Sequence, residues 1–202
     1  MTVYTKTYSA PAISEKEILR YAGVTSSTEE IAELMAECLD ISLGSLSYNV
    51  CFAHFPIKHI SGGIDFGFSV SSSECLKKNL SDCDSVVLFA ATVGSGLDRL
   101  IARYSVMSPA KAFMLQAIGA ERIEALCNLF NQEISEQAKA DGRATAPRFS
   151  AGYGDLPLEF QRDIFKVLDC QRKIGVTLQE SLIMLPSKSV TAIIGIKTGD
   201  KR

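Results

Sequence analysis

The sequence is poor in the residues that mark several common kinds of site. Its 202 residues contain no tryptophan and only two histidines, His54 and His59, whose odd separation places them on opposite faces of one predicted strand. The six cysteines never fall in the C-x-x-C spacing that zinc sites and redox motifs use. We therefore predict no metal site and interpret the cysteines as buried, reduced thiols of a cytoplasmic protein.

A strong excess of one charge and long apolar runs are also absent. The formal net charge is −2 and the sequence pI is about 5.8, which disfavours a nucleic-acid partner. No apolar run approaches the roughly 18 residues of a membrane span, and residues 1–12 are too polar for a signal peptide. Ser181 has no plausible base nearby in the pattern and no nucleophile elbow occurs, so no catalytic residue is assigned. No membrane partner is predicted.

Helix signals are clear in three places. The segment Ser14-Glu15-Lys16-Glu17 is a capping box, in which the serine accepts a hydrogen bond and the glutamate reaches back, and it predicts a short helix ending at Gly23. A second such signal at residues 27–30 predicts another short helix. Ser108-Pro109 predicts the start of a long helix, inside which Gly119 indicates a close contact. Its predicted apolar face is Phe113, Leu115, Ile118, Ile123, Leu126, Leu129, Phe130 and Ile134.

Strand signals occur between and after these helices. Residues 48–60 are extended in pattern, residues 64–70 alternate strictly, and residues 86–91 form a continuous apolar run typical of a strand covered on both faces. Two last strands, near 182–185 and 190–196, are predicted to form a terminal hairpin. The mixed order predicts an α+β fold: a largely antiparallel sheet with packed helices. We expect a single domain over residues 1–202, with an N-terminal helical region (1–47) and a mixed sheet and helix core (48–202) that carries a ligand loop at 148–153.

A glycine-containing turn at Gly94-Ser95-Gly96 lies between a predicted strand and a predicted helix. This context suits a phosphate at a helix N-terminus. A dinucleotide fingerprint would require a third glycine where Arg99 stands, and a Walker loop would require a Gly-Lys pair. A phosphate site is therefore not predicted.

The segment Arg148-Phe149-Ser150-Ala151-Gly152-Tyr153 combines groups suited to a small zwitterion. A guanidinium is a planar fork of donors that matches a carboxylate. Gly152 lacks a Cβ, which lets main chain approach a ligand, and the ring of Tyr153 offers its face to a cation. The alternative interpretation is purely structural: Arg148 forms a surface ion pair, and Gly152-Tyr153 is a turn in which the tyrosine ring is buried.

These residues also carry a family resemblance. The order of motifs from Val86 to Ile196 resembles the S-adenosylmethionine-binding activation domain of cobalamin-dependent methionine synthase, in its small stand-alone form. The matching motifs are Arg148-x-x-x-Gly152-Tyr153, a following helix, Ile174-Gly175-Val176, Glu180-Ser181 and Pro186 with Ser189-Val190.

The resemblance implies roles for particular residues. Arg148 would hold the carboxylate of the methionine part, and a glutamate of the long helix would hold its ammonium group. Glu124 is the match for this glutamate, with Glu121 as the alternative in an uncertain register. The implied S-adenosylmethionine-binding residues are Arg148, Ala151, Gly152, Tyr153 and Glu124.

The resemblance further implies a function. The chain would bind S-adenosylmethionine and support the reductive methylation, and hence the reactivation, of cobalamin supplied by a partner, either a separate methionine synthase or a related corrinoid protein. A flavodoxin-type protein would supply the electron. The chain would then be a component of a methyltransferase rather than a self-sufficient enzyme. Two alternatives are a non-catalytic interaction module with a degenerate ligand site, and a small-molecule S-adenosylmethionine-dependent methyltransferase.

Three departures from the family pattern bear on binding. After the loop this chain reads Gly154-Asp155-Leu156-Pro157, where long methionine synthases have a stretch with proline and cysteine. The sequence shows no counterpart of their late tyrosine pair or of their early aspartate. These differences predict weaker binding, or a site that a partner closes.

Overall fold

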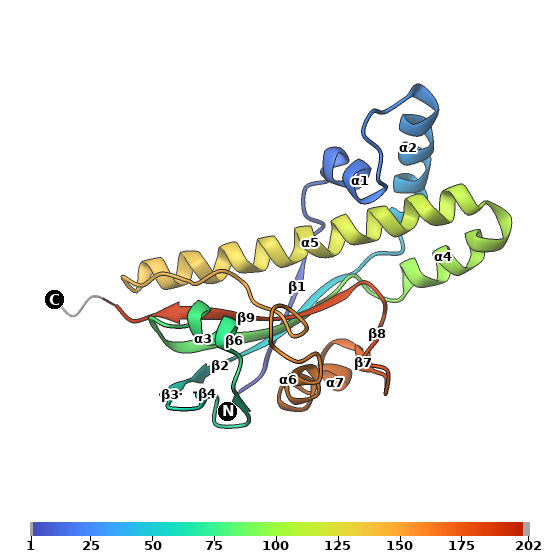
Figure 1. Cartoon of the computed structure of the whole chain (residues 1–202). Coiled ribbons are helices and arrows are strands. Elements are labelled where there is room, and N and C mark those ends of the chain that lie inside the picture. Colours follow the sequence, from blue (N-terminus) through green and yellow to red (C-terminus); the bar gives the residue numbers. More distant parts are fainter. Residues whose placement is uncertain (1, 200–202) are drawn as a thin grey trace.

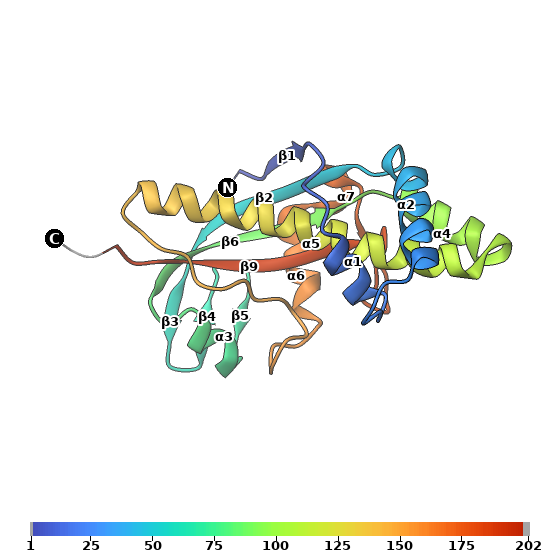
Figure 2. The same cartoon turned by 90° about the horizontal axis from the view of Figure 1, so that it is seen from above.

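The computed structural model describes residues 2–199, which are built around a four-stranded antiparallel sheet with the strand order β1-β2-β6-β9 (Figures 1 and 2). Two small sheets, β3-β4-β5 and β7-β8, accompany it. The strands are β1 (Tyr4–Tyr8), β2 (Tyr48–Pro56), β3 (Lys58–Ile60), β4 (Gly63–Asp65), β5 (Val70–Ser71), β6 (Cys83–Thr92), β7 (Thr177–Leu178), β8 (Met184–Leu185) and β9 (Ser189–Lys197). The helices are α1 (Glu15–Tyr21), α2 (Glu29–Leu43), α3 (Glu74–Asn79), α4 (Gly96–Met107), α5 (Pro109–Ala140), α6 (Phe160–Leu168) and α7 (Cys170–Ile174).

Helices cover both faces of the main sheet. Figure 1 shows α5 lying along one face, with α1 and α2 outside it, and α6 and α7 on the opposite face. Successive residues of β6 alternate between the two layers, because side chains of a strand point to opposite faces. Val87, Phe89 and Ala91 belong to the core under α5, whereas Val86, Leu88 and Ala90 belong to the core under α3, α6 and α7. The predicted α+β fold, and the prediction that β6 is covered on both faces, are confirmed.

The long helix α5 spans 32 residues and begins as predicted, with Ser108 as its N-cap and Pro109 in its first turn. Gly119 lies at a close approach: a Cβ there would be 2.4 Å from Leu97 Cδ2 and 2.9 Å from the Lys188 side chain. The close contact expected at Gly119 is confirmed. The predicted apolar face is wrong at Phe113, which is 58% exposed, and at Leu129.

The N-terminal region contains an element that the sequence did not predict. Residues 4–8 form β1, which pairs with β2 along the edge of the main sheet. Four of its five residues are exposed, so it lacks the apolar alternation that would have indicated a strand. The region 1–47 therefore contributes a strand to the sheet as well as the two predicted helices.

Two other strand predictions are wrong in detail. Residues 64–70 do not form one strand, because the chain turns at Gly67 (φ +78°) and returns as β5. The terminal hairpin does not form either. β8 pairs with β7, while β9 crosses to the main sheet and pairs with β6, where its apolar residues are buried on both faces.

Among residues 2–199, no helix combines the length and the apolar character that a membrane crossing requires.

Candidate ligand site at Arg148

The predicted ligand loop follows α5 and is fixed to the free edge of β9. The amide of Phe149 donates to the carbonyl of Ile193 at 2.9 Å, and the amide of Ile193 donates back to the carbonyl of Phe149 at 2.8 Å. Ala146 makes a further bond, from its amide to the carbonyl of Gly195 at 2.8 Å. A Cβ at Gly195 would lie 3.1 Å from that of Ala146, so the glycine permits this close approach. Arg148 is therefore placed by main chain that is tied to the sheet on both sides.

Arg148 points toward α5 and forms an ion pair with Glu124. Its Nη2 lies 2.9 Å from Glu124 Oε2 and 3.3 Å from Asn128 Oδ1, one helical turn further along. The other terminal nitrogen, Nη1, is buried without a hydrogen-bond partner among the described residues. A buried guanidinium nitrogen without an acceptor is costly, so this atom is suited to an incoming carboxylate.

The interior behind this pair is apolar. Burial raises the pKa of the nearby Cys127 thiol to about 12, although the positive charge of Arg148 opposes this shift. An ionic contact beside such an interior is screened less than one in water.

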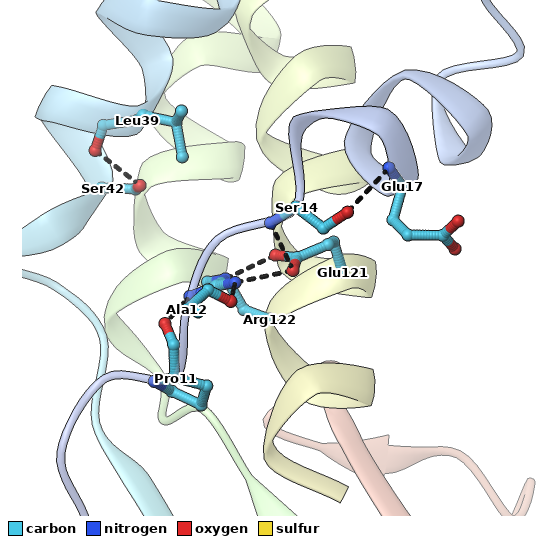
Figure 3. Close-up of polar contacts among 8 residues, drawn as sticks. All are labelled: Pro11, Ala12, Ser14, Glu17, Leu39, Ser42, Glu121 and Arg122. Atoms are coloured by element: carbon cyan, nitrogen blue, oxygen red, sulfur yellow. Dashed lines mark hydrogen bonds and ion pairs between the residues drawn. The ribbon is translucent and has the colours of Figure 1, made fainter. Parts of the chain in front are cut away.

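The structure separates the two candidate glutamates. Glu121 is buried and its carboxylate is occupied: Arg122 Nε lies 2.5 Å from Oε2, Arg122 Nη2 lies 2.6 Å from Oε1, and the amide of Ser14 donates to Oε1 at 3.1 Å (Figure 3). Glu124 is partly exposed and reaches Arg148. Of the two, Glu124 is the one in contact with Arg148.

The same contacts correct the predicted capping box. The Ser14 side chain accepts from the amide of Glu17, as expected. Glu17 does not reach back to the amide of Ser14, because that amide donates to Glu121 instead. Glu17 pairs with Arg20.

Ala151, Gly152 and Tyr153 form a tight turn beyond Arg148. Gly152 has φ +84°, a conformation that favours glycine, and its amide donates to the carbonyl of Leu156 at 2.9 Å. Ala151 is buried, whereas the ring of Tyr153 is 69% exposed and packs edge-on against Phe149 with a centroid separation of 5.3 Å. The turn thus uses the Gly152 amide internally and presents the Tyr153 ring to solvent, so this ring is not buried.

Asp155, in the stretch that departs from the family pattern, anchors this turn to α3. Its carboxylate accepts from the hydroxyl of Ser73, from the amide of Glu74 at 2.8 Å and from the amide of Cys75 at 3.1 Å. The Ser73 hydrogen bond, together with these amides, lowers the pKa of Asp155 to about 2. The carboxylate therefore stays ionised and fixes the turn to the helix beside it.

Two hollows are lined by the two members of the Arg148–Glu124 ion pair, one by Glu124 and the other by Arg148. The first, of about 300 Å³, lies between α5 and the segment preceding α1; Glu124 and Asn128, the two partners of Arg148, line it together with Ala12, Ser14 and Tyr21. We call it the strap pocket. The second, of about 670 Å³, is a more open groove lined by Arg148, Phe149, Tyr153, Cys75 and Lys78. We call it the ring groove. The arrangement suits an elongated ligand with one charged end and one flat, apolar end.

Sequence reasoning did not single out Asn128 or Arg122, although each carries a signal in the sequence. Asn128 stands four residues after Glu124, so the two lie on the same face of α5. Arg122 and Glu121 are consecutive charged residues within an otherwise buried stretch, and a pair of charges in such a stretch indicates a buried polar contact.

The other candidate features are structural. The turn at Gly94-Ser95-Gly96 packs closely on residues 45–47: a Cβ on Gly96 would lie 2.1 Å from the carbonyl oxygen of Ser45. His54 and His59 belong to two different strands, β2 and β3, so their predicted placement on one strand is wrong. Five of the six cysteines are buried and Cys75 is exposed; all six are free thiols. Within the described part of the chain, no group of three or more metal-binding side chains is close enough to hold an ion.

Comparisons with known proteins agree with the motif order. A family model described as the activation domain of vitamin B12 dependent methionine synthase matches residues 69–200. The chain is also similar to a solved structure described as the MetH reactivation domain bound to AdoHcy, with 15% sequence identity and a TM-score of 0.71 over 100% of this chain and 80% of that one. At 15% sequence identity, the similarity to this solved structure shows a shared fold and nothing further. No curated protein matches the sequence.

Proposed function

The chain belongs to the family of vitamin B12-dependent methionine synthase activation domains, and from this premise we propose that it binds S-adenosylmethionine and supports the reductive methylation of cobalamin held by a separate chain. The observation that carries the proposal is the Arg148–Glu124 ion pair, in which Glu124 lines the strap pocket and Arg148 lines the ring groove. The solved structure with a similar fold, described as bound to AdoHcy, supports a ligand of this class.

The paired charges fit the amino-acid end of S-adenosylmethionine. That end is a zwitterion, with a carboxylate and an ammonium group on one carbon. We propose that the guanidinium of Arg148 donates hydrogen bonds to the carboxylate, also through Nη1, which has no partner among the described residues. Glu124 would accept a hydrogen bond from the ammonium group. Each protein charge then exchanges one partner for another, so the bound state leaves no charge unpaired.

The flat end of the ligand would lie along the ring groove. There the exposed ring of Tyr153 and the adjoining Phe149 offer apolar surface to an adenine, and the turn at Ala151 and Gly152 gives main chain that can come close to it. The sulfonium would then lie between the two ends.

Bound S-adenosylmethionine would supply an electrophilic methyl group on its sulfonium. Passing that methyl group to a reduced metal requires no proton transfer, so the site needs neither a general acid nor a general base. The contribution of the protein is to bind the donor and to fix the direction in which its methyl group points. The cobalamin, and a flavodoxin-type donor of the electron, would come from partner chains.

Titration calorimetry tests the binding step. The wild-type protein should bind S-adenosylmethionine, and Arg148→Ala should weaken this binding by about a hundredfold, as expected for the loss of a charged, two-pronged contact of about 3 kcal/mol. Arg172→Ala is the matched control, because Arg172 is an exposed arginine whose ion pair is with Asp169, the residue that caps α7. No binding to the wild type would contradict the proposal and would favour a module with a degenerate site.

A spectroscopic assay tests the second step. The protein is mixed with a cobalamin-binding methionine synthase that lacks its own activation domain, S-adenosylmethionine and a reductant. The absorption spectrum of the cobalamin should convert to that of the methylated form only when the protein is present. Methylation of a small molecule in the absence of cobalamin would instead identify a small-molecule methyltransferase.

A further inference from the structure

The strap pocket has a wall that comes from outside the stretch matched by the family model. We define the strap as residues 9–14, which link β1 to α1 and cross α5. Ala12 and Ser14 of the strap line the pocket together with Glu124 and Asn128 of α5. The match to the family begins at residue 69, so the motif order does not account for this wall.

Two consecutive buried residues of α5 hold the strap in place. Arg122 Nη1 donates to the carbonyl of Pro11 at 2.7 Å, and Arg122 Nη2 donates to the carbonyl of Ala12 at 2.7 Å. Glu121 accepts from the amide of Ser14 at 3.1 Å and binds Arg122 through both of its oxygens. Figure 3 shows the two side chains directed at Pro11, Ala12 and Ser14. Three main-chain groups of the strap are thereby fixed to α5.

Because this ion pair is buried, its main effect is to fix the position of the strap rather than to add stability. The side chains of Arg122 and Glu121 are 2% and 4% exposed. A buried ion pair contributes little stability compared with apolar residues of the same volume, because both charges lose their hydration. Two apolar side chains could not form the three directed hydrogen bonds to the carbonyls of Pro11 and Ala12 and to the amide of Ser14.

Each carboxylate that lines the strap pocket forms an ion pair with an arginine. Glu17 pairs with Arg20, Glu121 with Arg122, and Glu124 with Arg148. When Arg148 turns to a ligand carboxylate, Glu124 is the lining carboxylate that loses its cation. An ammonium group entering the pocket restores the balance.

We infer that Glu121 and Arg122 are positioning residues: through the strap they hold the wall of the pocket that receives the ammonium end of the ligand. The inference rests on the proposed function and goes beyond it, since it assigns the N-terminal strap to the site. It also commits to a direction for the ligand, with the amino-acid end toward the strap and the adenine toward Tyr153.

Filling the pocket from the strap tests the inference without disturbing the buried pair. Ala12→Leu puts a longer side chain into the pocket, because Ala12 lines it and is otherwise exposed. Ala10→Leu is the matched control on the same strap, at an exposed position that is not part of the lining. We expect Ala12→Leu to weaken S-adenosylmethionine binding at least tenfold and Ala10→Leu to leave it unchanged. Both variants should unfold at the wild-type temperature.

A second measurement addresses Arg122 itself. Arg122→Lys keeps the charge but cannot reach both carbonyls and both oxygens of Glu121. The readout is the ratio of the affinities for S-adenosylmethionine and for 5′-methylthioadenosine, which lacks the amino-acid end. If Arg122→Lys only lowers stability, the affinities for both ligands should fall by the same factor and their ratio should stay constant. If the strap is loosened, the affinity for S-adenosylmethionine should fall more than that for 5′-methylthioadenosine, and the ratio should fall.

The outcomes distinguish a wrong role for the strap from a wrong proposed function. If the wild type binds S-adenosylmethionine and Ala12→Leu binds it equally well, the strap is not part of the site, and the proposed function stands without it. An unchanged ratio in Arg122→Lys likewise contradicts the positioning role. If the wild type does not bind S-adenosylmethionine at all, the proposed function itself is wrong.

Discussion

Arg148 and Glu124 lie 24 residues apart in the chain, on a loop and on a helix, and each is the counter-ion of the other. Their side chains are 24% and 40% exposed, so the pair is accessible enough for a ligand to reach and to displace. A zwitterion carries both of the charges needed to replace them. In the proposed function, the pair would therefore favour ligands with a carboxylate and an ammonium group over ligands with only one of the two.

Arg148→Lys should retain part of the binding. Lysine keeps the positive charge but loses the planar fork that contacts two carboxylate oxygens at once. We expect an affinity about tenfold below the wild type, between those of the wild type and Arg148→Ala. Calorimetry with S-adenosylmethionine measures this order, and an affinity of Arg148→Lys equal to that of Arg148→Ala would show that charge alone contributes nothing.

Glu121→Gln and Glu124→Gln should lower the free energy of unfolding by different amounts, although the two residues are one helical turn apart. Glu121→Gln leaves Arg122 buried without a counter-ion and should lower the free energy of unfolding by about 3–5 kcal/mol. Glu124→Gln removes one partly exposed pair and should lower it by less than about 1 kcal/mol. Glu124→Gln should instead weaken ligand binding. Chemical denaturation and calorimetry measure the two effects separately, and equal losses of stability would contradict the assignment.

Asp155→Asn should alter the dependence of stability on pH. The pKa of Asp155 in the folded protein is lowered to about 2, compared with about 4 in an unfolded chain. A carboxyl group whose pKa is lowered by folding stabilises the fold above the unfolded value, and this contribution is lost as the pH falls through the folded value. The difference in unfolding temperature between the wild type and Asp155→Asn should therefore be full at pH 5 and shrink toward pH 2.

The control for this titration is Asp40→Asn, at an exposed position on α2. This variant removes one carboxylate, as Asp155→Asn does, and leaves the contacts of Asp155 with α3 in place. A difference between the wild type and Asp155→Asn that stays constant from pH 5 to pH 2 would exclude Asp155 as the group that titrates.

Gly119→Ala should destabilise the protein even though alanine is the better helix former. The added methyl would meet Leu97 and Lys188 at distances that real Cβ atoms do not adopt, and overpacking of this kind costs about 1–3 kcal/mol. Gly44→Ala is the control, because Gly44 has a helical φ of −77° and open space around it. Thermal unfolding should show a loss for Gly119→Ala and no loss for Gly44→Ala.

Local patterns predicted much of this fold. The continuous apolar run in β6, the Ser14 side-chain cap of α1 and the proline at the start of α5 depend on neighbouring residues alone, and these features were predicted correctly. The strand β1 was missed because its residues are mostly exposed, and its stability comes from its pairing with β2. The destination of β9 was also mispredicted. Its apolar pattern gives no information on whether β6 or β8 is its partner.

The candidate site shows the same limit. The sequence indicated Arg148 and the tight turn after it, because their chemistry is readable from adjacent residues. It left the choice between Glu121 and Glu124 open, since this depends on which face of α5 meets the loop. The contribution of Ala12 and Ser14 could not be predicted either, because it follows from the path of the chain over a helix more than a hundred residues later.

The strand order of the main sheet has a practical consequence for fragments of this protein. A fragment limited to residues 69–200 would lack β1 and β2, so the main-chain groups of β6 that pair with β2 would become an open edge. It would also leave Arg122 and Glu121 without the chain that covers them. Unprotected edges of this kind associate with other molecules. Expression of such a fragment should give aggregated material.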